Sequence, residues 1–247
     1  MCLLCFLLGL GLRLAVSAND AQLNQLLDRY WEDFLKIDPI QATYVGDSRY
    51  HHLLPNPLDP EHRQRQRVFY RESLEALRPL EGSDLSREGQ LSLELLKWEC
   101  DTKLKQLDFD THLLPLNQFN SFHLTIGQFA SGQGAQPFKT VNDYERWLQR
   151  LDRFLPWCFG AQQAMREGIR KGITLPKSLT RKVIPQIEGL SKGPIHEHLF
   201  YQPVHRLPDS VSPDEKRRLT HVYSEIVERR VIPAFQSLLQ FLRDEYL

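Results

Sequence analysis

Apolar residues recur every three or four positions along most of the chain from Asn19 onward, which is the spacing of one buried helix face. The first such segment, residues 20–37, ends before a proline, because the residue preceding proline is displaced from the helical region. Two more helices are predicted over residues 60–77 and from Ser86 to about Leu104. No convincing period-two alternation and no strand–helix–strand rhythm is present, so an all-α fold is expected.

The same pattern continues after a long irregular stretch. A helix is predicted to start at Thr140, where Thr140 and Asp143 have the spacing of an N-terminal cap. Pro156 is expected to bend or break this helix, because an interior proline loses a backbone hydrogen bond and clashes with the preceding turn. A further helical piece is then expected up to Ile169, with Gly172 ending it.

The last third of the chain predicts two more helices. The stretch LPKSLTRKVIPQIEGL predicts a short helix kinked at Pro185, and residues 191–211 are expected to form a proline-bearing loop. Ser212 and the Pro-Asp-Glu that follows it form the clearest helix start in the chain. Apolar positions then recur as far as Tyr246, with a kink expected at Pro233.

Residues 108–139 form the long irregular stretch between the third predicted helix and Thr140. Loops of this length are uncommon inside compact domains and often line functional sites. Three polar side chains within it, Asn117, Gln118 and His123, are therefore the candidate substrate contacts. The alternative is a surface excursion without a binding role.

The first eighteen residues, MCLLCFLLGLGLRLAVSA, differ from the rest of the chain. Their apolar run is too short to span a bilayer and ends in small residues, which is typical of a secretory signal peptide. A retained anchor or a misplaced start is the alternative. The expected organisation is a signal peptide over residues 1–18 and a single helical domain over residues 19–247. The mature protein is expected to be exported to the periplasm or the cell exterior, and no membrane span is expected after cleavage.

Composition narrows the function classes. Lys and Arg total 31, Asp and Glu total 31, and the net charge is zero. The excess of positive charge that is typical of nucleic-acid-binding proteins is therefore missing from the composition. A hydrophobic fraction of 41% is enough for a sizeable core. After cleavage only Cys100 and Cys158 remain, which excludes a disulfide framework and leaves either one bridge or two isolated buried thiols.

The histidines do not form a recognisable metal site. A helical zinc site of the peptidase kind needs His-Glu-x-x-His, so that both imidazoles lie one turn apart. The nearest string, His196-Glu197-His198, has Phe and Gln where the partner histidines would stand. His51 and His52 near Asp47 are more typical of a structured turn. No metal ligand is predicted.

A nucleophile is also not indicated. His221 and Glu225 lie one helical turn apart, which is typical of a surface pair. The sequence contains no Gly-x-Ser-x-Gly, and the glycines of GQFASGQGAQ lack the Lys-Ser/Thr ending of a phosphate loop. No catalytic residue is therefore predicted in this chain.

Four stretches in order resemble a family of bacterial, often exported proteins, domain of unknown function 885. The first is YWEDFLKIDPIQATYVGDSRYHHLLPN, where the shared positions are Tyr30, Pro39, Ala42, Thr43, Gly46, Asp47 and Tyr50. In PFKTVNDYERWLQRLDRF they are Thr140, Asp143, Tyr144, Leu148, Arg150 and Leu151. In MREGIRKGITLPKSLTRKVIPQ they are Arg166, Gly168, Gly172 and Pro176, and VIPAFQSLLQFLRDEYL is similar to the helix that closes the N-terminal half.

This resemblance implies an all-helical, zinc-metallopeptidase-like protein about twice as long as this chain. Its His-Glu-x-x-His element and zinc would belong to the second half, so no zinc ligand or catalytic glutamate carries over to residues here. The chain is then expected to be a fragment: the N-terminal half of a zincin-like multi-helix array, inactive alone, whose partner is the missing C-terminal half. The alternative is a secreted, non-catalytic helical binding or scaffold module.

Overall fold

The computed structural model describes residues 17–247, and within this range the chain is helical with no β-strand, which confirms the all-α prediction. The predicted signal peptide lies outside the described residues except for its last two positions. The α-helices are α1 (Ala18–Ile37), α2 (Pro39–Tyr44), α3 (Pro60–Leu77), α4 (Arg87–Asp108), α5 (Phe122–Ala130), α6 (Val141–Lys171), α7 (Lys177–Leu190), α8 (Pro213–Ile226) and α9 (Ile232–Phe241).

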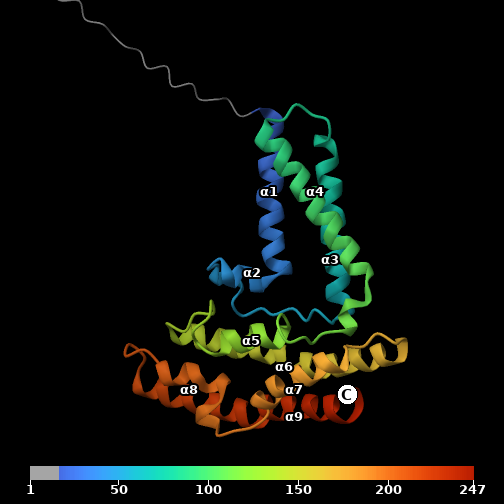
Figure 1. Cartoon of the computed structure of the whole chain (residues 1–247). Coiled ribbons are helices and arrows are strands. Elements are labelled where there is room, and N and C mark those ends of the chain that lie inside the picture. Colours follow the sequence, from blue (N-terminus) through green and yellow to red (C-terminus); the bar gives the residue numbers. More distant parts are fainter. Residues whose placement is uncertain (1–16) are drawn as a thin grey trace, which may run out of the picture.

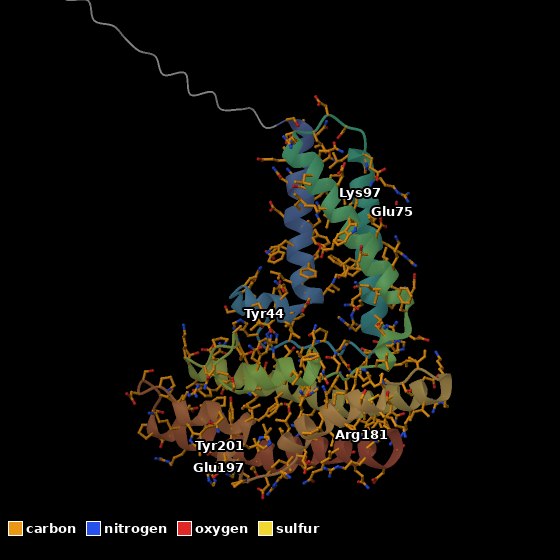
Figure 2. All side chains as sticks on the ribbon, in the orientation of Figure 1. Tyr44, Glu75, Lys97, Arg181, Glu197 and Tyr201 are labelled. Atoms are coloured by element: carbon orange, nitrogen blue, oxygen red, sulfur yellow. The ribbon has the colours of Figure 1, made fainter. Side chains whose placement is uncertain are left out.

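The helices form an upright arm on a layered base (Figure 1). The arm consists of α1, α3 and α4, and α3 packs along α4 over much of its length. The base consists of α5 to α9, with α9 packed against both α6 and α7. The short α2 lies at the foot of the arm and ends at Tyr44, which is labelled in Figure 2. The Tyr44 ring contacts the Phe129 ring of α5, with 5.5 Å between the ring centroids.

Arm and base each have their own hydrophobic core. The arm core is built from Leu23, Tyr70, Leu77, Leu80, Leu93, Leu96 and Cys100. The base core is larger and aromatic, with Trp147, Phe154, Trp157, Phe200 and Phe235 all fully buried. Because each buried aromatic or leucine contributes about 1.5–3 kcal/mol, the long amphipathic helices are held mainly by this packing.

Side-chain caps fix where the helices begin. The predicted start at Thr140 is confirmed, because the Thr140 hydroxyl and the Asp143 carboxylate form a reciprocal capping box. The Ser212 hydroxyl accepts from the Glu215 N–H at 3.3 Å and so caps the start of α8. At the top of the arm, Asp20 of α1 accepts from the Ser86 hydroxyl at 2.9 Å, which ties α1 to the start of α4.

Of the sequence-based expectations about prolines, one needs correction. The separate helical piece expected after Pro156 is wrong, because α6 runs continuously through that position. Leu155 and Trp157 on either side of the proline are buried in the base core, and this packing compensates for the lost backbone hydrogen bond. Pro185 likewise lies inside the continuous α7. Ahead of Pro233 the structure places a π-helical turn, Val227–Val231, a common response to an interrupted hydrogen-bond ladder.

The stretches predicted as loops contain short helices. Residues 108–139 include the 3₁₀ turn Asp110–Leu113 and α5, and residues 191–211 include the 3₁₀ turns Ile195–Glu197 and Leu199–Arg206. The nine-residue α5, FHLTIGQFA, was missed because a short apolar run shows little periodicity. A second π-helical turn, Leu242–Tyr246, follows α9.

A tight glycine turn ends α6 and gives a first testable prediction. Gly172 has φ +73°, and the Ile173 N–H donates to the Gly168 carbonyl at 2.8 Å. A Cβ on Gly168 would lie 2.5 Å from the Ile173 carbonyl oxygen, so Gly168→Ala should destabilise the chain by about 2 kcal/mol in urea unfolding. Gly189→Ala is the matched control, because a Cβ there meets nothing within 4 Å. Equal midpoints for the two variants would contradict this account of the turn.

Candidate functional site

A pocket of about 380 Å³ opens where the foot of the arm meets the base, and we call it the junction pocket. It lies between the start of α3, the end of α4, the loop before α5 and the middle of α6. Its polar lining includes Arg63, Gln66, Gln106, His112, Asn117, Asn120 and Ser121, and its apolar lining includes Leu58, Phe122 and Trp157. This size and this mixture are typical of a small-ligand site.

The apolar side of the junction pocket is part of the rigid base core. Trp157 is fully buried on α6, with its ring centroid 5.5 Å from that of Phe122 and 5.6 Å from that of Phe154. The uninterrupted passage of α6 through Pro156 places Trp157 under the pocket. Because Trp157 itself has no exposed surface, a ligand would meet the partly exposed Phe122 ring, which packs against Trp157.

Of the three predicted substrate contacts, Asn117 lines the junction pocket. Its side-chain oxygen accepts from the backbone N–H groups of Phe119 at 2.9 Å and Asn120 at 2.6 Å. These bonds form a local turn of the kind that asparagine favours, and they hold Asn120 at the pocket edge. Asn117 therefore shapes the pocket with its amide oxygen.

Gln118 and His123 do not line the junction pocket. The Gln118 carbonyl accepts from the Gln186 side chain of α7 at 3.0 Å, which anchors the loop to the base. His123 lies on α5 with 0% exposure. The structure thus separates the three residues that the loop assignment had grouped, and a substrate role for them stays a prediction.

The buried His123 ring contacts the hydroxyl of Ser121, which precedes α5 and does not cap it. A hydroxyl beside an imidazole is the pair that an activated serine requires. Burial, however, lowers the pKa of His123 to about 4, an effect that the Gln186 amide opposes. An imidazole with such a pKa is a weak base near neutral pH, where general-base catalysis favours a value close to 7. The contact is therefore better suited to fixing the start of α5 than to activating a nucleophile.

Charge at the junction pocket is organised around three cations. Arg67 pairs with Asp108 at 2.6 Å, and Lys171 pairs with Asp110 at 3.2 Å. Arg63 donates to the Leu107 carbonyl at 3.1 Å and has no carboxylate within ion-pair distance among the described residues. Burial, followed by the positive charge of Arg67, lowers the pKa of Arg63.

Sequence analysis did not single out Arg63. The available signal is its position one turn before Arg67 and two turns before the buried Tyr70, which places two arginines on the apolar face of α3. His112 was also missed. Burial and the Arg63 charge lower the pKa of this half-buried ring, whereas Asp110 opposes the shift.

The metal candidates from the sequence are dispersed. Within residues 17–247, no three His, Cys, Asp or Glu side chains lie close enough together to hold a metal ion. His51 is buried beside a 3₁₀ turn, Ser48–Tyr50, in agreement with the structured turn expected there. The expected surface pair of His221 and Glu225 is present at 3.5 Å. The donors here do not fit a zinc centre.

The two cysteines within residues 17–247 are separate free thiols, Cys100 in the arm core and Cys158 in the base core. Burial raises the pKa of both thiols to about 12, so both are unreactive near neutral pH. The structure favours two isolated thiols over a disulfide bridge. No described helix combines the length and apolar composition that a bilayer crossing requires.

Comparison with known proteins identifies the fold and the family. The chain is similar to the crystal structure of a Colwellia psychrerythraea protein described as a lipoprotein, with a TM-score of 0.69 and 16% identity. The similarity covers 92% of this chain and 41% of that one, so the chain spans about two-fifths of its length. None of the curated proteins matches the chain. A sequence model of the DUF885 family matches residues 39–247, and the chain therefore belongs to this family of bacterial proteins of unknown function.

Proposed function

We propose that the chain forms the substrate-facing, non-catalytic portion of an exported helical protein of the metallohydrolase-like kind. The lipoprotein description of the structural neighbour supports export. The partial coverage of that neighbour supports a role as one part of a larger fold. That this part is the N-terminal one belongs to the proposal. Zinc and its catalytic glutamate would come from the remainder of such a protein.

The junction pocket is the observation that carries this proposal. It brings side chains from both the arm and the base around an aromatic surface, with amide groups at its edge. Amides and an aromatic surface suit the backbone and the apolar side chain of a peptide-like substrate. Hydrolysis needs an activated water or nucleophile, and no three metal-ligating side chains of residues 17–247 gather in the pocket lining.

A titration tests this proposal. The purified chain is titrated with N-acetyl-alanyl-phenylalanine, as the free acid and as the C-terminal amide, by isothermal calorimetry. We expect at least one form to bind with a millimolar or lower Kd and without hydrolysis. Asn120→Trp, which places a large ring at the pocket edge, should weaken binding at least tenfold, because Asn120 is exposed and lines the pocket. Glu88→Trp, at an exposed position on α4 outside the lining, is the control.

Three results would contradict the proposal. The first is that neither peptide binds, and the second is equal binding by the wild type and Asn120→Trp. The third is metal-dependent turnover of the peptide by the purified chain, because that would require a catalytic centre within it.

A second candidate is a self-sufficient helical binding or scaffold module. The favouring observation is an exposed apolar row on α4, where Leu91, Leu95 and Trp98 are 57%, 56% and 67% exposed at a helical spacing. Rows of this kind are typical of protein contact surfaces. Failure of both peptides to bind, together with a monomeric, cooperatively unfolding chain, would favour the module over the first proposal.

A further inference from the structure

We propose that the junction pocket binds a free carboxylate of its ligand through Arg63, while an apolar side chain of the same ligand packs against Phe122 and Leu58. This inference rests on the proposed function and specifies the substrate class: a peptide-like molecule with a free carboxyl terminus. Its basis is that one pocket combines the Arg63 charge with an apolar part of the lining.

The first step concerns charge balance. Of the cations near the pocket, Arg67 and Lys171 are each matched by an aspartate, at 2.6 and 3.2 Å. Arg63 is the cation left without such a partner among the described residues, and it lines the pocket directly. Asp110 lies near enough to act on Arg63 electrostatically, but Lys171 already holds it. One positive charge is therefore available to a ligand.

The second step concerns hydrogen-bonding capacity. A guanidinium has five N–H donors in a planar fork, and Arg63 makes one hydrogen bond, to the Leu107 carbonyl. That bond fixes one edge of the side chain against the end of α4. A partly buried guanidinium with free donors favours a bidentate carboxylate, because two parallel charge-assisted hydrogen bonds offset the cost of its burial.

The third step distinguishes a carboxylate from a phosphate. A phosphate group near neutral pH carries more charge than one unpaired arginine balances. His112, the other basic group in the lining, has its pKa lowered by burial and by Arg63, so it provides a neutral ring rather than a second cation. Phe122 and Leu58, which line the pocket and are partly exposed, also favour an apolar group on the ligand, which a hydrophobic C-terminal residue supplies.

The test compares the two forms of one peptide. Wild-type chain should bind N-acetyl-alanyl-phenylalanine about tenfold more tightly as the free acid than as the amide, measured by isothermal calorimetry. Arg63→Gln should reduce this acid-to-amide preference to less than twofold, because the variant loses both the charge and the planar guanidinium fork. Arg65→Gln is the matched control: Arg65 lies on the same helix, is exposed and pairs only distantly with Glu61, at 3.9 Å.

Each outcome decides a different point. Equal binding of acid and amide by the wild type overturns the carboxylate inference and leaves the proposed function standing, whereas no binding of either form overturns both. An equal loss of preference in Arg65→Gln and Arg63→Gln would show a general field effect and would also overturn the inference. The comparison of the two peptides on the wild-type chain needs no variant, so it remains decisive if Arg63→Gln does not fold.

Discussion

Arg150→Met should destabilise the chain by about 3–5 kcal/mol, the largest effect expected for a single substitution here. Arg150 is fully buried on α6, and its guanidinium is surrounded by neutral acceptors. These are the carbonyls of Pro39 (3.4 Å), Tyr50 (3.0 Å) and Leu53 (3.0 Å), the Thr43 hydroxyl (2.9 Å) and the Gln136 side-chain oxygen (2.7 Å). Methionine fills part of the volume but provides no donor. The Pro39 and Tyr50 carbonyls keep bonds from the Thr43 hydroxyl and the Leu53 N–H, whereas the Leu53 carbonyl and the Gln136 side-chain oxygen lose their donor.

Conservative replacement should not rescue this position. Burial lowers the pKa of Arg150 to about 10, with Asp38 opposing the shift, so the folded chain already carries the cost of desolvating the charge. An ammonium group has three donors and no planar fork, so Arg150→Lys cannot serve five acceptors. We expect Arg150→Lys to lose most of the same stability.

Urea unfolding followed by circular dichroism measures the effect. The matched control is Arg146→Met, one turn earlier on α6, where the side chain makes one exposed bond to the Ser48 carbonyl at 2.7 Å. Loss of that bond should cost about 1 kcal/mol or less. If Arg150→Met were no more destabilising than Arg146→Met, the acceptors around Arg150 would not depend on its charge.

The case of Arg150 shows what the sequence can and cannot predict. Its place in a helix follows from the Thr140 cap and the apolar spacing, and the family resemblance includes Arg150 itself. Its role does not follow, because most of the acceptors lie in residues 39–54, about a hundred positions earlier. Caps and periodicity are local signals, whereas this contact exists only after α6 has packed beneath α2 and the turn that follows it.

The same difference between local signals and long-range packing explains which residues of the candidate site could be predicted. Asn117 could be selected because it stands in a long segment between helices, and it does line the junction pocket. Arg63 could not be selected in that way, since it lies inside a predicted helix and only the packing of α3 on α4 shows that it lacks a carboxylate. His123 was expected to face a substrate because its segment was predicted to be irregular, and the folding of that segment into α5 buries the ring instead.

Acidification should destabilise the chain through His123. Burial lowers the folded-state pKa of His123 to about 4 from the ordinary histidine value of 6.5. Between these values the unfolded chain binds one more proton at this site than the folded chain does, so stability falls as the pH drops from 6.5 to 4. A gap of this size corresponds to about 3 kcal/mol, fully present above pH 6.5 and lost as the pH approaches 4.

The slope of stability against pH isolates this one group. The pKa values of His51, His62 and His198 are also lowered, mainly by burial, so wild-type stability should fall by more than the His123 share. His123→Gln should make the slope between pH 6 and 4.5 shallower by about 1.4 kcal/mol per pH unit, whatever it does to stability at pH 7. His196→Gln, at an exposed ring, is the control. Parallel profiles for wild type and His123→Gln in urea unfolding would show that the ring can be protonated in the folded chain, and that α5 opens to solvent more readily than its packing implies.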